Sequence, residues 1–220
     1  MSFKQVFISP VGRKITMGLT GIFLILFLIV HVGLNLCVFG GEDMFNSAAH
    51  FMGGFWVPRV LEIGLFAMLI IHIVQGTILE MDNRSKRGIG YQVSYGNRGS
   101  KWNSRSMWFL GILILLFLIL HLSDFWFPNR SHQHFVLGEE INLFEKMQDT
   151  FSHLWVVIVY IIGCIALAYH LLHGFQSAFR SLGVYNKTWL ALLNCIGIGF
   201  SIIVPLLFIS MPVSFYFGWV

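Results

Sequence analysis

The sequence predicts an all-α integral membrane protein in which five helices form one transmembrane bundle. Of its 220 residues, 56% are hydrophobic and only 11% are charged, whereas a soluble domain carries about a quarter charged residues. A spanning helix needs about 20 mostly apolar residues, and lipid offers no hydrogen-bond partner to an open backbone. Five stretches meet this length, at 15–39, 59–80, 107–127, 153–178 and 189–213. We therefore expect residues 1–220 to form a single transmembrane domain.

The basic residues predict the orientation of this bundle. The first stretch is too long for the core of a signal peptide and has no A-x-A site, so we expect it to remain as a helix. Basic residues gather before it and in two loops, 81–106 and 179–188, whereas the opposite side carries only Arg59, Arg130 and Lys146. Because basic loops stay in the cytoplasm, the N-terminus is expected inside and the C-terminus outside. The net charge of +4 reflects this bias and indicates no nucleic-acid partner.

Each of the first four stretches contains a histidine, and the fifth contains neither a histidine nor a charge. The four residues are His31, His72, His121 and His170. An ionisable side chain inside a membrane span is energetically costly and indicates a functional site. One histidine on each of four helices is the pattern that a bundle needs to ligate haem iron from both sides. The simpler alternatives are hydrogen bonds between helices and a proton relay.

The depths of the four histidines predict how they pair. His31 and His121 lie 17 and 16 residues from the basic residues at the inner ends of their stretches. His72 and His170 lie only 8 and 9 residues from the inner ends of theirs. With a fixed rise of about 1.5 Å per residue, these counts predict an outer pair, His31 with His121, and an inner pair, His72 with His170. Two b-type haems are therefore expected, with these histidines as axial ligands of the iron.

His173 is a fifth histidine within the spans. It follows His170 by three residues and therefore faces nearly the same side of its helix. We expect it to contact a haem propionate, with replacement of His170 as the ligand, quinone contact and simple packing as the alternatives. The three cysteines, Cys37, Cys164 and Cys195, have no spacing typical of a disulfide or an iron–sulfur centre.

Several short motifs resemble those of a known family. They are FNSAAHFM at 45–52, LEI at 61–63, IH-x-x-x-G at 71–76 and YH-x-x-x-G at 169–174. With these motifs, the chain resembles the single-polypeptide, five-helix, dihaem cytochrome b subunit that anchors succinate dehydrogenases and fumarate reductases, respiratory complex II, in the bacterial cytoplasmic membrane. The resemblance runs over essentially the whole chain. It implies the same ligand pairs, His31 with His121 for the outer haem and His72 with His170 for the inner one.

The resemblance also implies what surrounds this subunit. A flavoprotein subunit with covalent FAD would act on succinate or fumarate, and an iron–sulfur subunit would exchange electrons with the inner haem. The membrane subunit would pass these electrons to or from a quinone, with menaquinone expected. No flavin motif or glycine-rich nucleotide fingerprint is present, so the dicarboxylate chemistry is expected in the partners. Both directions, succinate oxidation and fumarate reduction, remain open.

Glu62 is the candidate for proton transfer to the quinone. It is an acid near the outer end of the second stretch, and a quinone takes up a proton with each electron, which requires a titratable group. The alternative is a glutamate exposed at the start of a helix, after Pro58. The other outer histidines, His50, His132, His134 and His153, are expected at the solvated surface. The basic loop 82–105 is expected to contact the iron–sulfur subunit, or only to reflect the bias in charge.

Two other classes of protein remain open at this point. One is the dihaem cytochrome b of another quinone-linked enzyme, of the nitrate reductase, hydrogenase or formate dehydrogenase type, in which one helix commonly supplies two ligands. The other is a haem-free transporter or proton channel, for which broken helices and paired intramembrane acids would be typical. One histidine on each of four helices favours the complex II subunit over both.

Overall fold

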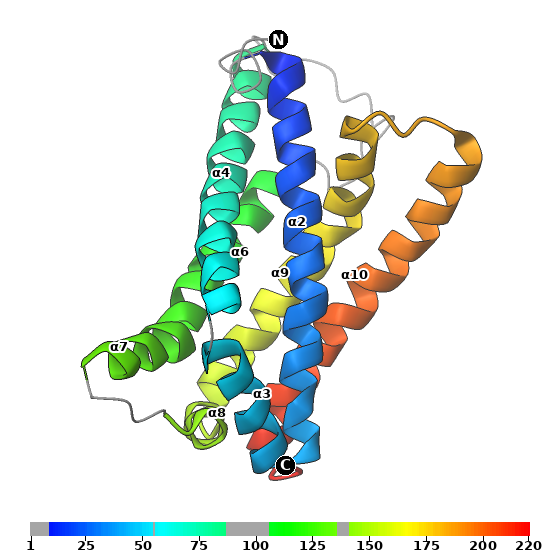
Figure 1. The fold of residues 1–220 in the computed structure, drawn as a ribbon. Helices are drawn as coiled ribbons and strands as arrows, with labels where there is room; N and C mark the ends of the chain where they lie inside the picture. Colours follow the sequence, from blue (N-terminus) through cyan, green and yellow to red (C-terminus); the bar gives the residue numbers. More distant parts are fainter. Residues whose placement is uncertain (1–8, 55, 87–105, 136–140) are drawn as a thin grey trace.

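A computed structural model describes residues 9–54, 56–86, 106–135 and 141–220 of the chain, which form a bundle of long helices (Figure 1). Among these described residues, five helices are long and apolar enough to cross a membrane, over Pro10–Gly40, Trp56–Ser85, Met107–Ser131, Leu154–Ser181 and Lys187–Tyr216. Each contains most of one predicted stretch, so the all-α fold with five spans is confirmed. The start of α2 and the C-terminus lie at opposite ends of the bundle, as an odd number of spans requires.

The spans are built from the following helices. They are α2 (Pro10–Leu36) with a 3₁₀ turn η1 (Cys37–Gly40), α4 (Trp56–Lys86), α6 (Met107–His121) with a π-helical segment η2 (Leu122–Trp126) and α7 (Phe127–Phe135), α9 (Leu154–Ser181) and α10 (Lys187–Tyr216). Side chains fix two of the starts, because Ser9 accepts from the Gly12 N–H at 3.0 Å and Asn186 accepts from the Thr188 N–H at 2.9 Å.

Two short helices lie between the spans, where the sequence analysis expects loops. They are α3 (Glu42–Gly54) and α8 (Leu143–Phe151), which lie at the end of the bundle that holds the C-terminus (Figure 1). The amide of Asn46 on α3 donates to the Asn142 side chain at 2.8 Å, and Asn142 donates to Glu42 at 2.6 Å. These polar contacts join α3 to α8 and cover the end of the bundle.

The helices surround α9, which packs against α2, α6 and α10, while α4 packs mainly on α2. The larger buried cluster lies toward the end covered by α3 and α8, and it includes Val38, Phe151, Val157, Tyr160 and Met211. In contrast, large apolar side chains such as Ile63 on α4 and Ile203 on α10 are 72% and 57% exposed. Because a membrane span presents apolar side chains to lipid tails, these exposed faces agree with a bundle embedded in a bilayer.

Candidate functional site

The structure brings His31 of α2 and His121 of α6 together. Their ring centres are 5.8 Å apart, and the ring planes meet at 84°. Aromatic side chains surround them, since Phe27 stacks on His31 at 5.1 Å and Phe117 stacks on His121 at 5.7 Å. The ring of Phe208, on α10, lies 5.5 Å from His31. The outer pair therefore lies in an aromatic environment made by three helices, α2, α6 and α10.

His72 of α4 and His170 of α9 form the second pair. Their ring centres are 6.3 Å apart, with an angle of 62° between the planes. The Thr20 hydroxyl, on α2, lies 3.1 Å from Nδ1 of His72. Because Thr20 and His31 are separated by 11 residues on the same helix, the two pairs lie roughly 16 Å apart along α2. The structure therefore brings together the same two pairs of histidines that their depths in the sequence predict.

The geometry of both pairs fits two axial ligands of one haem. Two imidazoles on one iron have their ring centres roughly 6 Å apart, because each metal–nitrogen bond is about 2 Å long and the nitrogen lies about 1 Å from the ring centre. Within the described residues, the buried Nδ1 atoms of His121 and His170 have no hydrogen-bond partner. No group of three or more His, Cys, Asp or Glu in the described part of the chain could hold a metal ion. Two histidine ligands would suit a haem, whose porphyrin would supply the other four nitrogens.

His173 lies on α9, half-buried and near enough to His170 to interact with it electrostatically. The ring that meets His72 is that of His170. The expected contact of His173 with a propionate therefore stays a prediction.

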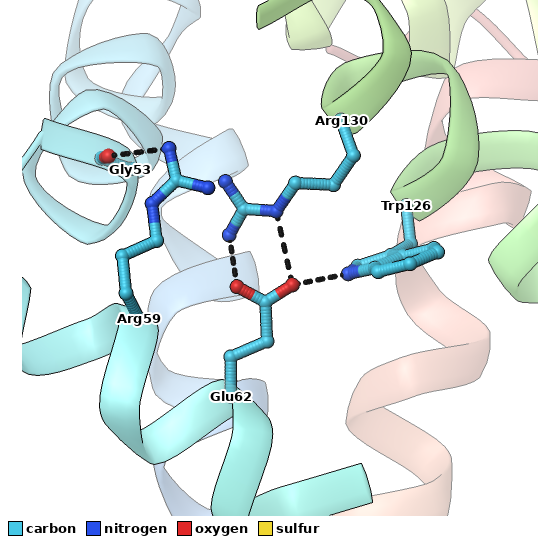
Figure 2. Close-up of polar contacts among 5 residues, drawn as sticks. All are labelled: Gly53, Arg59, Glu62, Trp126 and Arg130. Atoms are coloured by element: carbon cyan, nitrogen blue, oxygen red, sulfur yellow. Dashed lines mark hydrogen bonds and ion pairs between the residues drawn. The ribbon is translucent and has the colours of Figure 1, made fainter. Parts of the chain in front are cut away.

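Glu62 has partners that the sequence analysis does not predict. Figure 2 shows it between Trp126 and Arg130, with Arg59 on the other side of the cluster. The Trp126 indole donates to Glu62 at 2.5 Å, and the Arg130 guanidinium donates to both carboxylate oxygens, through Nε at 2.9 Å and through Nη2. The side chains of Glu62 and Arg130 are only 19% and 16% exposed. Glu62 is therefore partly buried rather than exposed, because Trp126 and Arg130 from the third span contact it.

Sequence reasoning missed a second polar group, close to the outer pair. Tyr160 of α9 donates through its hydroxyl to Asp124 of η2 at 2.8 Å, and its ring centre lies 6.0 Å from that of His121. Tyr160 is only 6% exposed. Asp124 is an acid inside the third apolar stretch, three residues after His121, so its position in the sequence is the signal that could have found it.

The remaining outer histidines differ in their surroundings. His50 lines a cavity of about 250 Å³ with Asn46, Asn129 and Asn142, so part of the FNSAAHFM motif forms one wall of this cavity. His153 precedes α9 at the exposed surface, with its Nδ1 2.6 Å from the Ser152 hydroxyl. The side chains of His132 and His134 and most of the basic loop 82–105 lie outside the described residues.

Comparisons with known proteins identify the family. No family model matches the chain, and no solved structure matches it. The chain is 30% identical, over 160 residues, to the succinate dehydrogenase cytochrome b558 subunit of Bacillus subtilis (strain 168), an alignment that covers 72% of this chain and 73% of that protein. Five apolar helices agree with a membrane subunit of this kind. The chain therefore belongs to the family of succinate dehydrogenase cytochrome b subunits, the membrane anchors of respiratory complex II.

Proposed function

We propose that this subunit holds two b-type haems, with His31 and His121 as the axial ligands of the outer haem and His72 and His170 as those of the inner one. The observation that carries the proposal is the pairing itself. Four histidines from four helices meet two by two inside a membrane bundle, with ring centres 5.8 and 6.3 Å apart. Histidines that only hydrogen-bonded to neighbouring helices would not need this spacing in both pairs.

The residues around the pairs would set the environment of the haems. Bound haem supplies a one-electron couple between ferric and ferrous iron. The aromatic rings of Phe27 and Phe117 pack on the outer histidines and keep water from them, and a low-polarity surrounding is one of the factors that tune a haem potential. The roughly 16 Å between the pairs along α2 suits transfer of electrons across the bilayer.

The proposed role of the subunit is electron transfer between an iron–sulfur subunit and a membrane quinone, with menaquinone expected. A flavoprotein subunit with FAD would act on the dicarboxylate, and the relative's name supports succinate dehydrogenase as the complex. The bias in basic residues supports a cytoplasmic N-terminus in the inner membrane of a bacterium. The inner haem would then lie toward the iron–sulfur subunit.

Glu62 is proposed to transfer protons in the quinone reaction, now together with Arg130. Glu62 lies near the start of α4, and Arg130 lies on α7 (Figure 2), which follows the η2 segment that begins directly after His121. A carboxylate held by an arginine can receive a proton when the charge on a neighbouring quinone changes, and the guanidinium can hold a reduced quinone oxygen. This arrangement supports a quinone site at the outer side.

Alanine variants of the four histidines, made in the whole complex, test the ligand assignment. Redox difference spectra of the membranes should show loss of one haem in each variant, with the same haem lost in His31→Ala and His121→Ala and the other in His72→Ala and His170→Ala. Immunodetection of the inserted chain separates haem loss from failed assembly, and His153→Ala should keep both haems. Inserted variants with both haems would reject the proposal, and loss of the inner haem in His173→Ala but not in His170→Ala would reassign that ligand.

A further inference from the structure

Thr20 is buried against the inner histidine pair. Its residue is only 2% exposed, and its hydroxyl oxygen lies 2.9 Å from the Thr16 carbonyl, 3.2 Å from the Met17 carbonyl and 3.1 Å from Nδ1 of His72. Threonine in a helix often bonds back to a carbonyl of the preceding turn. The contact with His72 is different, because it joins α2 to a histidine on α4.

The three contacts of this hydroxyl indicate which nitrogen of His72 carries its proton. A hydroxyl has a single hydrogen and can accept through its lone pairs, whereas a carbonyl can only accept. The Thr16 carbonyl is the shortest contact of this hydroxyl. With its hydrogen assigned to that carbonyl, the Thr20 oxygen has lone pairs left to accept from a protonated Nδ1 of His72. In a neutral imidazole the other nitrogen, Nε2, is left with a lone pair that can bind a metal.

The position of the ring agrees with this assignment. A Cβ added to Gly21 would lie 3.7 Å from Cε1 of His72, so the edge of the ring formed by Nδ1 and Cε1 faces α2. In the outer pair the contact to Nδ1 comes from the same helix, because the Asn35 amide nitrogen lies 3.4 Å from Nδ1 of His31 and also donates to the His31 carbonyl at 2.8 Å.

We infer that Thr20 is a positioning residue of the inner haem, which holds His72 with Nδ1 protonated and Nε2 presented to the iron. The inference rests on the proposed ligand role of His72. A hydrogen bond to the outer nitrogen of a ligating histidine fixes the orientation of the ring and raises its basicity, and loss of such a bond typically changes affinity or activity 10- to 100-fold. A more basic imidazole favours ferric iron, so loss of the bond should raise the reduction potential of the inner haem.

Redox titration of the complex with Thr20→Val tests this role. Valine keeps the shape of threonine but removes the oxygen, and we expect about a tenfold shift of the inner haem toward the reduced form, which equals about 59 mV for one electron. The outer haem should titrate as in the unchanged protein. Electron paramagnetic resonance of the oxidised protein gives a second readout, because the low-spin ferric signal changes with the orientation of the axial rings.

Two further variants make the result specific. Thr20→Ser keeps the hydroxyl and should restore the inner potential, while Thr16→Val removes a buried hydroxyl one turn away and should leave both potentials unchanged. Equal potentials in Thr20→Val and the unchanged protein, or an equal shift in Thr16→Val, would overturn the role of Thr20. His72→Ala with both haems retained would instead reject the ligand assignment, so the two failures can be told apart.

Discussion

Replacement of Glu62 by glutamine removes the negative charge of this residue and keeps the shape of its side chain. The carboxylate accepts three hydrogen bonds, one from Trp126 and two from Arg130, and the amide of glutamine offers only one oxygen. Hydrogen bonds to charged groups contribute about 1.5–3 kcal/mol each. Because both side chains keep some exposure, the contribution of the ion pair must be reduced for screening, and we expect a net loss of about 2 kcal/mol. For a chain of this size such a loss lowers the midpoint of thermal unfolding by about 4–8 °C.

The same variant should lose most quinone-linked activity, because glutamine cannot take up and release the proton. Both haems should remain, and succinate oxidation with a soluble artificial acceptor should stay at the level of the unchanged complex. The assay is therefore a comparison of two acceptors in the same membranes, together with a redox spectrum that measures the amount of haem.

Asp149→Asn is the matched control for Glu62→Gln. Asp149 lies at the surface with its side chain 76% exposed, and its carboxylate is 3.9 Å from the Lys146 ammonium. An exposed pair of this kind contributes at most about 1 kcal/mol, so stability and both activities should hardly change. Full quinone activity in Glu62→Gln would refute the proton role and place the quinone site elsewhere. An unchanged unfolding midpoint would refute the energetic estimate.

Two other variants probe the surroundings of the outer pair. Tyr160→Phe removes the donor to Asp124 and leaves a half-buried carboxylate without it, so thermal unfolding should show a loss of about 1–3 kcal/mol; stability equal to the unchanged protein would contradict this. Gly163→Ala places a Cβ 2.5 Å from the Phe117 ring, which stacks on His121, and the resulting strain of about 1–3 kcal/mol should alter the absorption spectrum of the outer haem. Gly197→Ala crowds Phe175 in the same way, away from the outer pair, and should leave that spectrum unchanged.

The spans and the pairing of the histidines could be predicted because both depend on simple quantities. A bilayer needs a fixed length of apolar sequence, and the rise of an α-helix is constant. Residues His31 and His121 could therefore be assigned to one depth without knowledge of how their helices pack. Their distance and ring angle depend on side-chain packing, which no count of residues contains.

The surroundings of Glu62 could not be predicted for a different reason. Arg130 lies beyond the apolar stretch 107–127, so the sequence analysis assigns it to an outer loop. In the structure η2 and α7 extend the third span as helix through Arg130. Helix ends are poorly marked by hydropathy because polar residues near the membrane surface can continue a helix. The short helices α3 and α8 were missed for the same reason, since their many polar residues give them the low hydropathy that is typical of a loop.

The π-helical segment Leu122–Trp126 separates α6 from α7 in the third span. It sets the direction in which the side chains of α7 point relative to those of α6. Each residue of an α-helix turns the chain by about 100°, and a π-bulge is equivalent to one residue inserted into that periodic order. The helix before it carries His121, which meets His31, whereas Trp126 at the end of the segment and Arg130 after it contact Glu62. In evolutionary terms, loss of one codon within this segment would turn the outer part away from α4 while the ligand stayed in place. A change in this segment would thus affect the contacts of Trp126 and Arg130 with Glu62 and leave the histidine pair in place.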